Sequence, residues 1–321
     1  MNHLTLTAAF GNYDRTGMLQ KGTVRPEGID LRIITLPPIE IFHRMSRFPE
    51  FEVSEMSMGT HCHLLGTGDS PFVGMPAFPS RVFRHSMVYV NVDAGIEKPE
   101  DLNGKRIAIH EWGMTAVVWI IGIMGEEYGL EPTSVDWMAA IQPRVPVQFP
   151  ANTNIRYLEG GQKISDLLES GEVDAAFLHQ VPACFAKGSP RVKRMFPDYK
   201  STEVEYYQRT GIHPIMHCII LRKDIYRQHP WALQSLYKAF CEARQKVVDA
   251  LSDNGALFAM IPFLPSVMEE TYNIFGRDFW PYGIEANRKT LEKLVQYAHQ
   301  QGLAPRILDV DELFAPTFKG V

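Results

Sequence analysis

The clearest fold signal in the chain is the segment Leu4–Thr60, which reads LTLTAAFGNYDRTGMLQKGTVRPEGIDLRIITLPPIEIFHRMSRFPEFEVSEMSMGT. Alternating apolar residues predict strands over Leu4–Phe10 and Ile29–Leu36, and turn-forming residues separate the two. Helical spacing over Ile39–Arg47 then leads to a third expected strand, Phe51–Met58. Strands and helices that alternate in this order are typical of an α/β domain with a parallel sheet.

A second unit of the same kind occupies about residues 90–205. Its central feature is an expected helix over Thr115–Tyr128, with Gly129 as the residue that ends it. A shorter helix is expected over Ile164–Ser170. The segments expected as strands around these helices are Val82–Val92, Ile107–Ile109, Val135–Ile141, Ile155–Leu158 and Val173–Leu178.

The last third of the chain is expected to be one strand followed by mostly helical material. The strand is predicted over Ile212–Leu221. Apolar residues at helical spacing predict helices over Trp231–Leu251 and Arg288–Gln301. This return of helices after a second α/β unit indicates that the second unit is inserted into the first.

An inserted unit predicts a molecule with two lobes. The length of 321 residues suits about two domains. We expect one lobe from residues 1–88 plus 216–321 and the other from residues 89–215, connected by two extended crossings. The expected fold class is therefore α/β with two lobes and a ligand cleft between them, where loops at strand ends meet helix starts.

Composition excludes several classes of protein. Hydrophobic residues make up 45% of the chain and charged residues 21%, which is ordinary for a globular protein. A net charge of −5 without a basic run gives no support for nucleic-acid binding. The longest apolar run, Ala116–Met124, is too short to cross a bilayer, and Met1–Thr5 shows no export signal. We therefore expect a cytoplasmic protein with no membrane partner, and a homo-oligomer is compatible with these features.

The densest cluster of candidate site residues lies in the segment Phe78–Ser86. Arg81, Arg84 and His85 are three potential cations within five positions, where the first lobe gives way to the second. Guanidinium groups bind carboxylates through two parallel hydrogen bonds, so a carboxylated ligand is the natural partner. The alternative is a solvated basic turn or a salt bridge between the lobes.

Two further histidines, His213 and His217, are separated by four residues. Pro214 disfavours helical geometry at His213, so we expect an extended segment with both imidazoles on one face. Paired imidazoles in this arrangement act as acid and base groups or as ligands. The alternative is a purely structural role for both.

His61 and His63 are expected on one side of an extended chain. Together with His213 and His217 they would form a zinc site, since zinc accepts imidazole ligands readily. No motif such as HExxH supplies a further ligand. We therefore predict no metal site, and we expect a histidine of this group, His61, to line the cleft instead.

The segment His110–Thr115 directly precedes the expected helix Thr115–Tyr128. Free backbone N–H groups and the positive end of a helix dipole make such a start a natural site for an anion, and the Thr115 hydroxyl would add a donor. The alternative is simple capping of the helix. His179 follows an expected strand, so we expect it at the same side of the cleft as this helix start, although a histidine at the end of a strand is more often structural.

Tyr13 and Asp14 follow the first expected strand and so belong to the cleft as well. Tyr13 is a candidate substrate-binding residue, and Asp14 is either a base or the partner of Arg15. No glycine-rich nucleotide loop and no GxSxG motif is present in the sequence. We accordingly predict that the protein uses no cofactor.

Several segments form a recognisable series along the chain: Tyr13–Thr16, Arg25–Leu31, Phe78–Arg81, Phe83–Ser86, Tyr89–Asn91, Met114–Ala116, Pro214–His217, Gln234–Phe240 and Trp280–Gly283. With these segments in order, the chain resembles the 4,5-dihydroxyphthalate decarboxylase family from about residue 4 to residue 316. The resemblance implies a type II periplasmic-binding-protein fold that has been recruited for catalysis. It also implies functional roles for Arg81, Arg84, His85 and His217, which lie within the matching motifs.

The resemblance implies removal of one carboxylate from 4,5-dihydroxyphthalate, which gives protocatechuate and carbon dioxide; another phthalate-like or hydroxybenzoate-like acid is an alternative substrate. Protonation of the ring carbon before carbon dioxide leaves avoids an aryl anion. We expect His217 or His85 to donate this proton and Asp14 or His213 to lie near the hydroxyls. Arg81 and Arg84 are expected to bind carboxylates.

The alternative function is that of a solute-binding protein that delivers a small aromatic carboxylate to a transporter. Its fold would be the same, and a fold does not settle a function. A periplasmic binding protein needs an export signal, and it has no need of several titratable groups in one cleft. We therefore favour the decarboxylase, with a small aromatic carboxylate as its only predicted partner.

Overall fold

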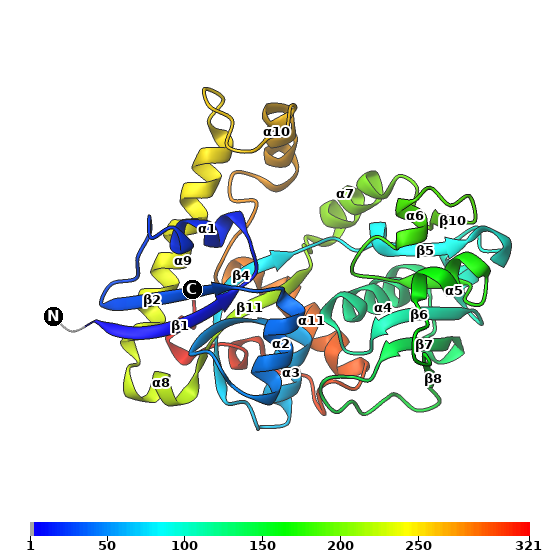
Figure 1. The fold of residues 1–321 in the computed structure, drawn as a ribbon, viewed down its shortest axis with the longest axis horizontal. Coiled ribbons are helices and arrows are strands. Elements are labelled where there is room, and N and C mark those ends of the chain that lie inside the picture. The colour runs from blue at the N-terminus through cyan, green and yellow to red at the C-terminus, as the bar shows by residue number, and fades with distance from the viewer. Residues whose placement is uncertain (1–2) are drawn as a thin grey trace.

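The computed structural model describes residues 3–321 and contains two separate β-sheets, which lie side by side in Figure 1. The five-stranded sheet has, in spatial order, the strands β2 (Ile29–Thr35), β1 (Leu4–Phe10), β3 (Val53–Ser57), β11 (Ile215–Arg222) and β4 (Phe72–Arg81). The six-stranded sheet has the strands β10 (Val192–Arg194), β5 (Val88–Asn91), β9 (Ala175–Phe177), β6 (Arg106–Glu111), β7 (Asp136–Ile141) and β8 (Asn154–Tyr157).

Helices follow the strands in both parts of the molecule. Those joined to the five-stranded sheet are α1 (Asp14–Gln20), α2 (Pro38–Arg47), α3 (Met58–Gly66), α8 (Lys223–Gln228), α9 (Trp231–Ser252), α10 (Leu264–Phe275) and α11 (Arg288–Gln300). Those that follow strands of the other sheet are α4 (Thr115–Tyr128), α5 (Ile164–Ser170), α6 (Ala183–Ala186) and α7 (Tyr199–Thr210). Strands β1, β2 and β3 are parallel, as expected, whereas β11 runs antiparallel to both its neighbours. The observed fold class is the predicted one.

The chain passes between the sheets twice, once between β4 and β5 and once between α7 and β11. The predicted lobes of residues 1–88 plus 216–321 and of residues 89–215 place their boundaries close to these passages. The division into two domains at those residues stays a prediction. Within the described residues no helix is both long and apolar enough to span a membrane.

Of the predicted strand Val82–Val92, only the second half is a strand, β5, and the first half is not. The strand β4 ends at Arg81, a 3₁₀ turn covers His85–Met87, and β5 begins at Val88 in the other sheet. Apolar residues stand at both ends of this segment, and the polar run Arg84–Ser86 between them is where the chain changes sheets. The strand β4 itself was missed because it contains two prolines, which are tolerated there since β4 is an edge strand.

The helix α4 matches its predicted bounds, and Gly129 ends it in the left-handed conformation with φ of 67°. All residues from Thr115 to Met124 are buried, because the helix lies between the two sheets and contacts elements of both parts. Two hydrogen bonds tie its surroundings to the end of α11. The Trp112 indole donates to the Gln301 carbonyl at 3.0 Å, and the Gln301 amide donates to the Val118 carbonyl at 2.9 Å.

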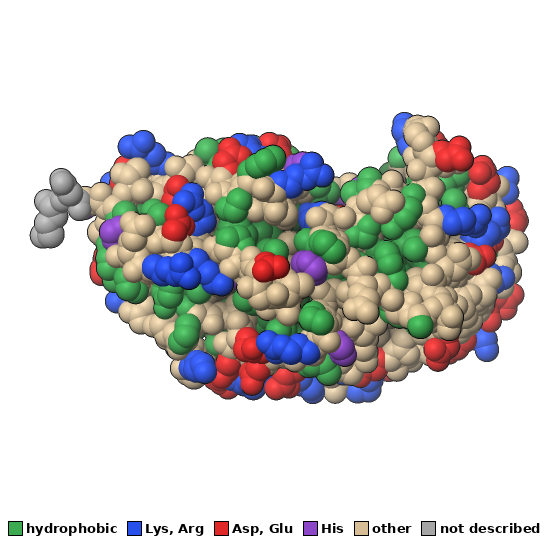
Figure 2. Space-filling model, turned by 90° about the horizontal axis from the view of Figure 1, so that it is seen from below, with side chains coloured by type: hydrophobic (Ala, Val, Ile, Leu, Met, Phe, Trp, Pro, Cys, Tyr) green, Lys and Arg blue, Asp and Glu red, His purple; other side chains and the backbone are tan. Residues whose placement is uncertain are grey.

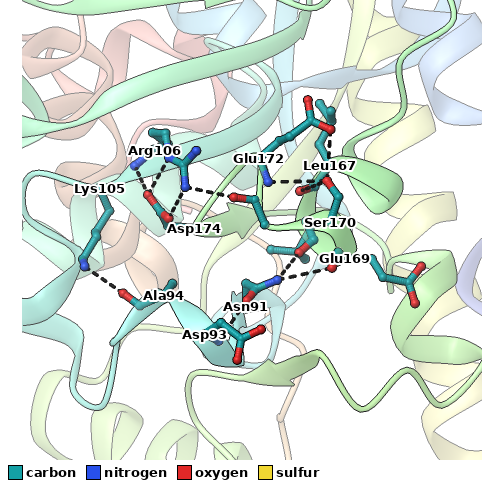
Figure 3. Close-up of polar contacts among 12 residues, drawn as sticks. Asn91, Asp93, Ala94, Lys105, Arg106, Leu167, Glu169, Ser170, Glu172 and Asp174 are labelled. Atoms are coloured by element: carbon teal, nitrogen blue, oxygen red, sulfur yellow. Dashed lines mark hydrogen bonds and ion pairs between the residues drawn. The ribbon is translucent and has the colours of Figure 1, made fainter.

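An ion pair and an amide contact tie inner strands of the six-stranded sheet to each other and to α5 (Figure 3). Arg106 at the start of β6 donates to Asp174 at 2.6 Å and 3.0 Å, so the pair is bidentate. The Asn91 amide donates to the Leu168 carbonyl at the end of α5, at 2.7 Å. These contacts join β5, β6 and α5 without touching the space between the sheets.

Candidate active site

A cavity of about 340 Å³ lies between the two sheets and is lined from both sides. The five-stranded side and its connections contribute Tyr13, Phe42, Ser57, Ser80 and His217, and the other side contributes Met87, Met114, Thr115, Arg144, His179 and Gln180. Arg84 enters from the passage between the sheets. In Figure 2 the outline narrows to a notch between the two parts, and acidic and basic side chains are interspersed over the face shown.

The centre of the site is a pair formed by His217 on β11 and Glu55 on β3. Nδ1 of His217 lies 2.8 Å from Oε2 of Glu55, whose side chain is fully buried. Glu55 also accepts the Gly11 N–H at 2.5 Å and the Tyr13 hydroxyl at 3.0 Å. A carboxylate with three donors holds the imidazole in one orientation and stabilises positive charge on the ring. With Nδ1 engaged, Nε2 is the nitrogen available to a ligand in the cavity.

Tyr13 completes this group from the start of α1. Burial raises the pKa of its hydroxyl far above the usual value, and the negative charge of Glu55 adds to the effect. The hydroxyl therefore stays protonated and acts as a donor to Glu55, 3.4 Å from Nδ1 of His217. Tyr13 lines the cavity, so the structure places it where the sequence predicted.

Arg84 supplies a buried positive charge that is not paired with a carboxylate. Its Nη2 lies 2.9 Å from Sδ of Met216, and the nearby Glu203, whose charge acts on the guanidinium, forms no salt bridge with it in the described part of the chain. Burial lowers the pKa of the guanidinium to about 10, so it remains charged at neutral pH. An unpaired buried cation that lines a cavity is suited to bind an anionic group of a ligand.

Arg144 reaches the cavity from the loop between β7 and β8. Its Nε donates to Oε1 of Glu111 at 2.9 Å and its Nη2 to Oε2 at 2.5 Å, while Nη1 is buried without a partner in the described part of the chain. Glu111 is almost fully buried. Neither residue was selected from the sequence, and neither was Glu55, because isolated charged residues give no local signal.

The start of α4 forms one end of the cavity. Met114, Thr115 and Ala116 line it, and the first N–H groups of the helix have no partner within the helix. The Thr115 hydroxyl lies 2.7 Å from that of Ser57 and accepts the Gly59 N–H at 2.9 Å, so it also ties α4 to α3. The N-cap of α4 is Met114, whose side chain makes no capping hydrogen bond, so the alternative of simple capping by a side chain is not observed.

His179 lines the cavity beside the two arginines. Burial, together with the nearby His110, Arg84 and Arg144, lowers the pKa of its ring to about 4, so His179 is neutral at neutral pH. The ring of His110 lies 5.2 Å from that of His179 but is not part of the cavity lining. The expectation that His110 contacts the substrate is therefore corrected.

Arg81 and His213 lie together, but outside the cavity, contrary to prediction. Arg81 donates to the Pro281 carbonyl at 2.6 Å, to the His213 carbonyl at 3.4 Å and to the side chain of Asn287, while its buried Nε has no partner among the described residues. The ring of His213 stacks on Phe83 at 4.7 Å. His213 and His217 do not share a face, because β11 begins only at Ile215 and its pairing with β4 shifts register there.

His85 and Asp14 are not placed at the cavity either. His85 is 1% exposed and packs against Phe196 and Tyr206, with no hydrogen-bond partner for either ring nitrogen among the described residues. Asp14 pairs with Arg15 at 2.8 Å on the surface, which is the alternative left open above. The predicted catalytic roles of both residues are corrected by this placement.

His61 and His63 are in the helix α3, so the predicted extended segment is wrong. Nε2 of His61 lies 2.7 Å from the Leu313 carbonyl, and Nδ1 of His63 lies 2.9 Å from the Leu303 carbonyl. Two residues apart, helical side chains point in different directions, so the two rings diverge. His61 does not line the cavity. Across residues 3–321, no group of three histidine, cysteine or acidic side chains is arranged to hold a metal ion.

Comparison with known proteins gives close relatives by sequence and more distant ones by structure. The chain is 35% identical to the 4,5-dihydroxyphthalate decarboxylase of Comamonas testosteroni, with 98% of each chain covered. It is 33% identical to the 4,5-dihydroxyphthalate decarboxylase of Pseudomonas putida over 65% of this chain and 83% of the relative. No family model matches the chain.

The structural relatives share the fold at low identity. The periplasmic aliphatic sulphonate binding protein SsuA of Escherichia coli superposes with a TM-score of 0.57 at 12% identity, over 98% of both chains. The putative sulfonate-binding protein SsuA of Methylobacillus flagellatus KT gives a TM-score of 0.56 at 16% identity, over 99% of this chain and 93% of that one. At such identities the likeness establishes the fold alone, which is that of periplasmic binding proteins.

Proposed function

Because the chain belongs to the 4,5-dihydroxyphthalate decarboxylase family, we propose that it converts 4,5-dihydroxyphthalate to protocatechuate and carbon dioxide. The enzyme is a carboxy-lyase, and the reaction consumes one proton for each carboxylate released. The observation that supports this function most directly is the pair of His217 and Glu55 at a cavity that also contains unpaired guanidinium donors.

The order of bond changes follows from the instability of an aryl anion. Direct loss of carbon dioxide would leave the bonding electron pair on a ring carbon, which is too basic to form at a useful rate. If the same carbon is first protonated, the ring becomes electron-poor and a para hydroxyl stabilises it by releasing its own proton. The carbon–carbon bond then breaks, its electron pair restores the aromatic ring, and the hydroxyl is reprotonated. The substrate itself accepts the electrons, so we propose that no cofactor is needed.

His217 is the proton donor in this proposal. Its Nε2 faces the cavity, and Glu55 fixes the ring through Nδ1 and stabilises the imidazolium from which the proton leaves. Tyr13 adds a donor to Glu55 and so holds the carboxylate in place. Of the two histidines that the sequence left as alternatives, only His217 lines the cavity, because His85 is enclosed by aromatic rings.

Arg84 binds the carboxylate that stays on the product. Its charge has no acidic partner at hydrogen-bond distance within residues 3–321, so a ligand carboxylate would satisfy donors that the protein leaves free. Apolar side chains of the lining, among them Phe42, Met87 and Met216, provide a surface for an aromatic ring.

The proposal is tested by incubating the purified protein with 4,5-dihydroxyphthalate and separating the products by chromatography. We expect protocatechuate and carbon dioxide in equal amounts. In deuterium oxide, one deuterium should appear at the ring carbon that lost its carboxylate. The matched control is His217→Gln, which should bind the substrate and form little product. Tight binding without turnover by the unmodified protein would instead support the alternative of a solute-binding protein.

A further inference from the structure

The pair of Arg144 and Glu111 has a geometry that the proposed proton transfer does not use. Glu111 accepts three donors from Arg144: the backbone N–H at 2.8 Å, Nε at 2.9 Å and Nη2 at 2.5 Å. The guanidinium is therefore held along one edge, and the remaining nitrogen, Nη1, is buried without a partner in the described chain. A buried N–H donor that lacks an acceptor is costly, and an anionic ligand in the cavity would provide one.

Arg144 and His217 both lie close to the ring of Phe42. The Phe42 ring is 4.7 Å from the ring of His217, and Cζ of Arg144 is 5.6 Å from the centre of the same Phe42 ring. Phe42 and His217 belong to the five-stranded part, whereas Arg144 comes from the other part. A ring carbon protonated by His217 would thus have Arg144 within reach of its substituents.

Arg84 approaches the same region from a different side. Its Nη2 contacts Met216, the residue directly before His217. His179 lies near both arginines and, being neutral, does not add to their repulsion. The site therefore presents two guanidinium groups, those of Arg84 and Arg144, near the imidazole of His217, and they come from two different segments of the chain. Two neighbouring carboxylates on an aromatic ring would match two separate cations better than a single carboxylate would.

We propose that Arg144, positioned by Glu111, is a specificity-determining residue that binds the second carboxylate of an aromatic ortho-dicarboxylate, while Arg84 binds the first. This inference rests on the proposed function and adds to it the residue that selects diacids over monoacids. Since Arg84 binds the carboxylate that stays on the product, Arg144 binds the one that leaves. This contact is present in the bound diacid and still present while the ring carbon is protonated, and it is lost only afterwards, as carbon dioxide forms. Arg144 therefore acts on binding of the diacid more than on the rate of proton transfer.

The test uses two ligands without ring hydroxyls, phthalate and benzoate, whose binding is measured by calorimetry. The unmodified protein should bind phthalate more tightly than benzoate. Arg144→Gln should weaken phthalate binding by about 10- to 150-fold, the loss expected for a hydrogen bond between charged groups, and change benzoate binding by less than about threefold. Glu111→Gln should weaken phthalate in the same direction by a smaller factor, because Arg144 keeps its charge but loses its fixed position.

The matched control is Arg106→Gln, which breaks a bidentate arginine–carboxylate pair of the same kind outside the cavity (Figure 3). It should leave the preference for phthalate unchanged. Because Glu111→Gln leaves a buried guanidinium without its partner, the unfolding temperature of each variant is measured as well, and the double variant Glu111→Gln with Arg144→Gln tests the pair without an unpaired charge. The double variant should fold and lack the preference.

The inference is overturned if Arg144→Gln keeps the preference for phthalate, or if it weakens both ligands equally. These outcomes are separate from failure of the proposed function. Turnover of 4,5-dihydroxyphthalate together with an unchanged preference in Arg144→Gln leaves the function intact and removes the role of Arg144. Absence of turnover together with a preference that depends on Arg144 leaves the diacid site intact and removes the decarboxylation.

Discussion

At the scale of single residues, the chemistry depends on a carboxylate that water does not reach. The Glu55 side chain is fully buried, and its two oxygens accept from a backbone N–H, a phenol and an imidazole. Burial of a charge is costly unless donors surround it, and here they do. The same donors fix the direction of the His217 ring, so the position of the reactive nitrogen follows from the environment of Glu55.

We predict that His217→Gln lowers kcat by about 10²–10⁴ with little change in KM, because it removes the proton donor and not the carboxylate contacts. Glu55→Gln should also lower kcat by about 10²–10⁴, since its amide can donate to Nδ1 and so favour the wrong tautomer of His217. Steady-state kinetics measure both effects. Glu55→Asp, which keeps the carboxylate, should recover part of the loss. A rise in KM without loss of kcat in Glu55→Gln would contradict the positioning role.

We predict that Arg84→Gln raises KM by roughly 30- to 1,000-fold and affects kcat much less, because its contact exists in both the bound substrate and the transition state. Arg81→Gln is the matched comparison, since Arg81 is equally buried but bonds to Pro281 and Asn287 instead of facing the cavity. Substrate titrations of the two variants distinguish the residues. Equal effects on KM would mean that the cavity does not bind the carboxylate through Arg84.

At the scale of secondary structure, α4 has two roles: its start lines the cavity, and its middle packs against α11. Gly122 is essential to this packing, because a Cβ at that position would overlap the ring of Tyr297. The Tyr297 hydroxyl donates to Glu126 one turn later in α4. Close approach of α4 and α11 therefore requires glycine at position 122.

We predict that Gly122→Ala destabilises the protein by about 1–3 kcal/mol, although alanine is the better helix former. The control is Gly17→Ala in α1, where a Cβ would meet no atom within 4 Å and the gain in helix propensity should stabilise by up to about 1 kcal/mol. Urea denaturation of the two variants measures both changes. If Gly122→Ala is also stabilising, the packing of Tyr297 on α4 is looser than the structure indicates.

At the scale of the whole molecule, several buried histidines make stability depend on pH. Burial lowers the pKa of both His61 and His85 to about 4, and Arg209 adds to the effect at His85. In the unfolded chain the pKa of a histidine ring is about 6.5. Between these two values the unfolded state binds more protons than the folded state, so stability falls as the pH falls from about 6.5 toward 4. Above that window the rings are neutral in both states and contribute no dependence.

We predict that His85→Phe reduces the loss of stability that occurs as the pH falls from about 6.5 toward 4. The ring of His85 already contacts the rings of Tyr128, Phe196 and Tyr206 and has no hydrogen-bond partner among the described residues, so phenylalanine suits the site. The variant should be more stable than the parent near pH 5, with a smaller difference near pH 8. Thermal unfolding at both pH values measures this. Full turnover by the same variant is also expected, since His85 does not line the cavity.

Most of the fold could be predicted from local patterns. Apolar alternation located β1, β2 and β3, and helical spacing together with a terminal glycine located α4 to the residue. These patterns can be seen in the sequence because the spacing of apolar residues along a helix or strand reflects which of its own sides are buried. The order of the elements then indicated an inserted unit, and the structural relatives bear out the fold class.

The site could be predicted only in part, because its geometry depends on partners far apart in the chain. Tyr13, Arg84, Thr115, His179 and His217 line the cavity as expected. Whether a basic residue faces the cavity depends on where its strand ends: Arg81 is the last residue of β4 and pairs with Ile215, whereas Arg84 lies in the passage between the sheets and lines the cavity. Glu55 lies 162 positions from His217 and meets it only because β3 and β11 pair. Sequence periodicity determines which residues are buried along one element, and tertiary structure alone decides which buried groups meet, since that contact forms across elements.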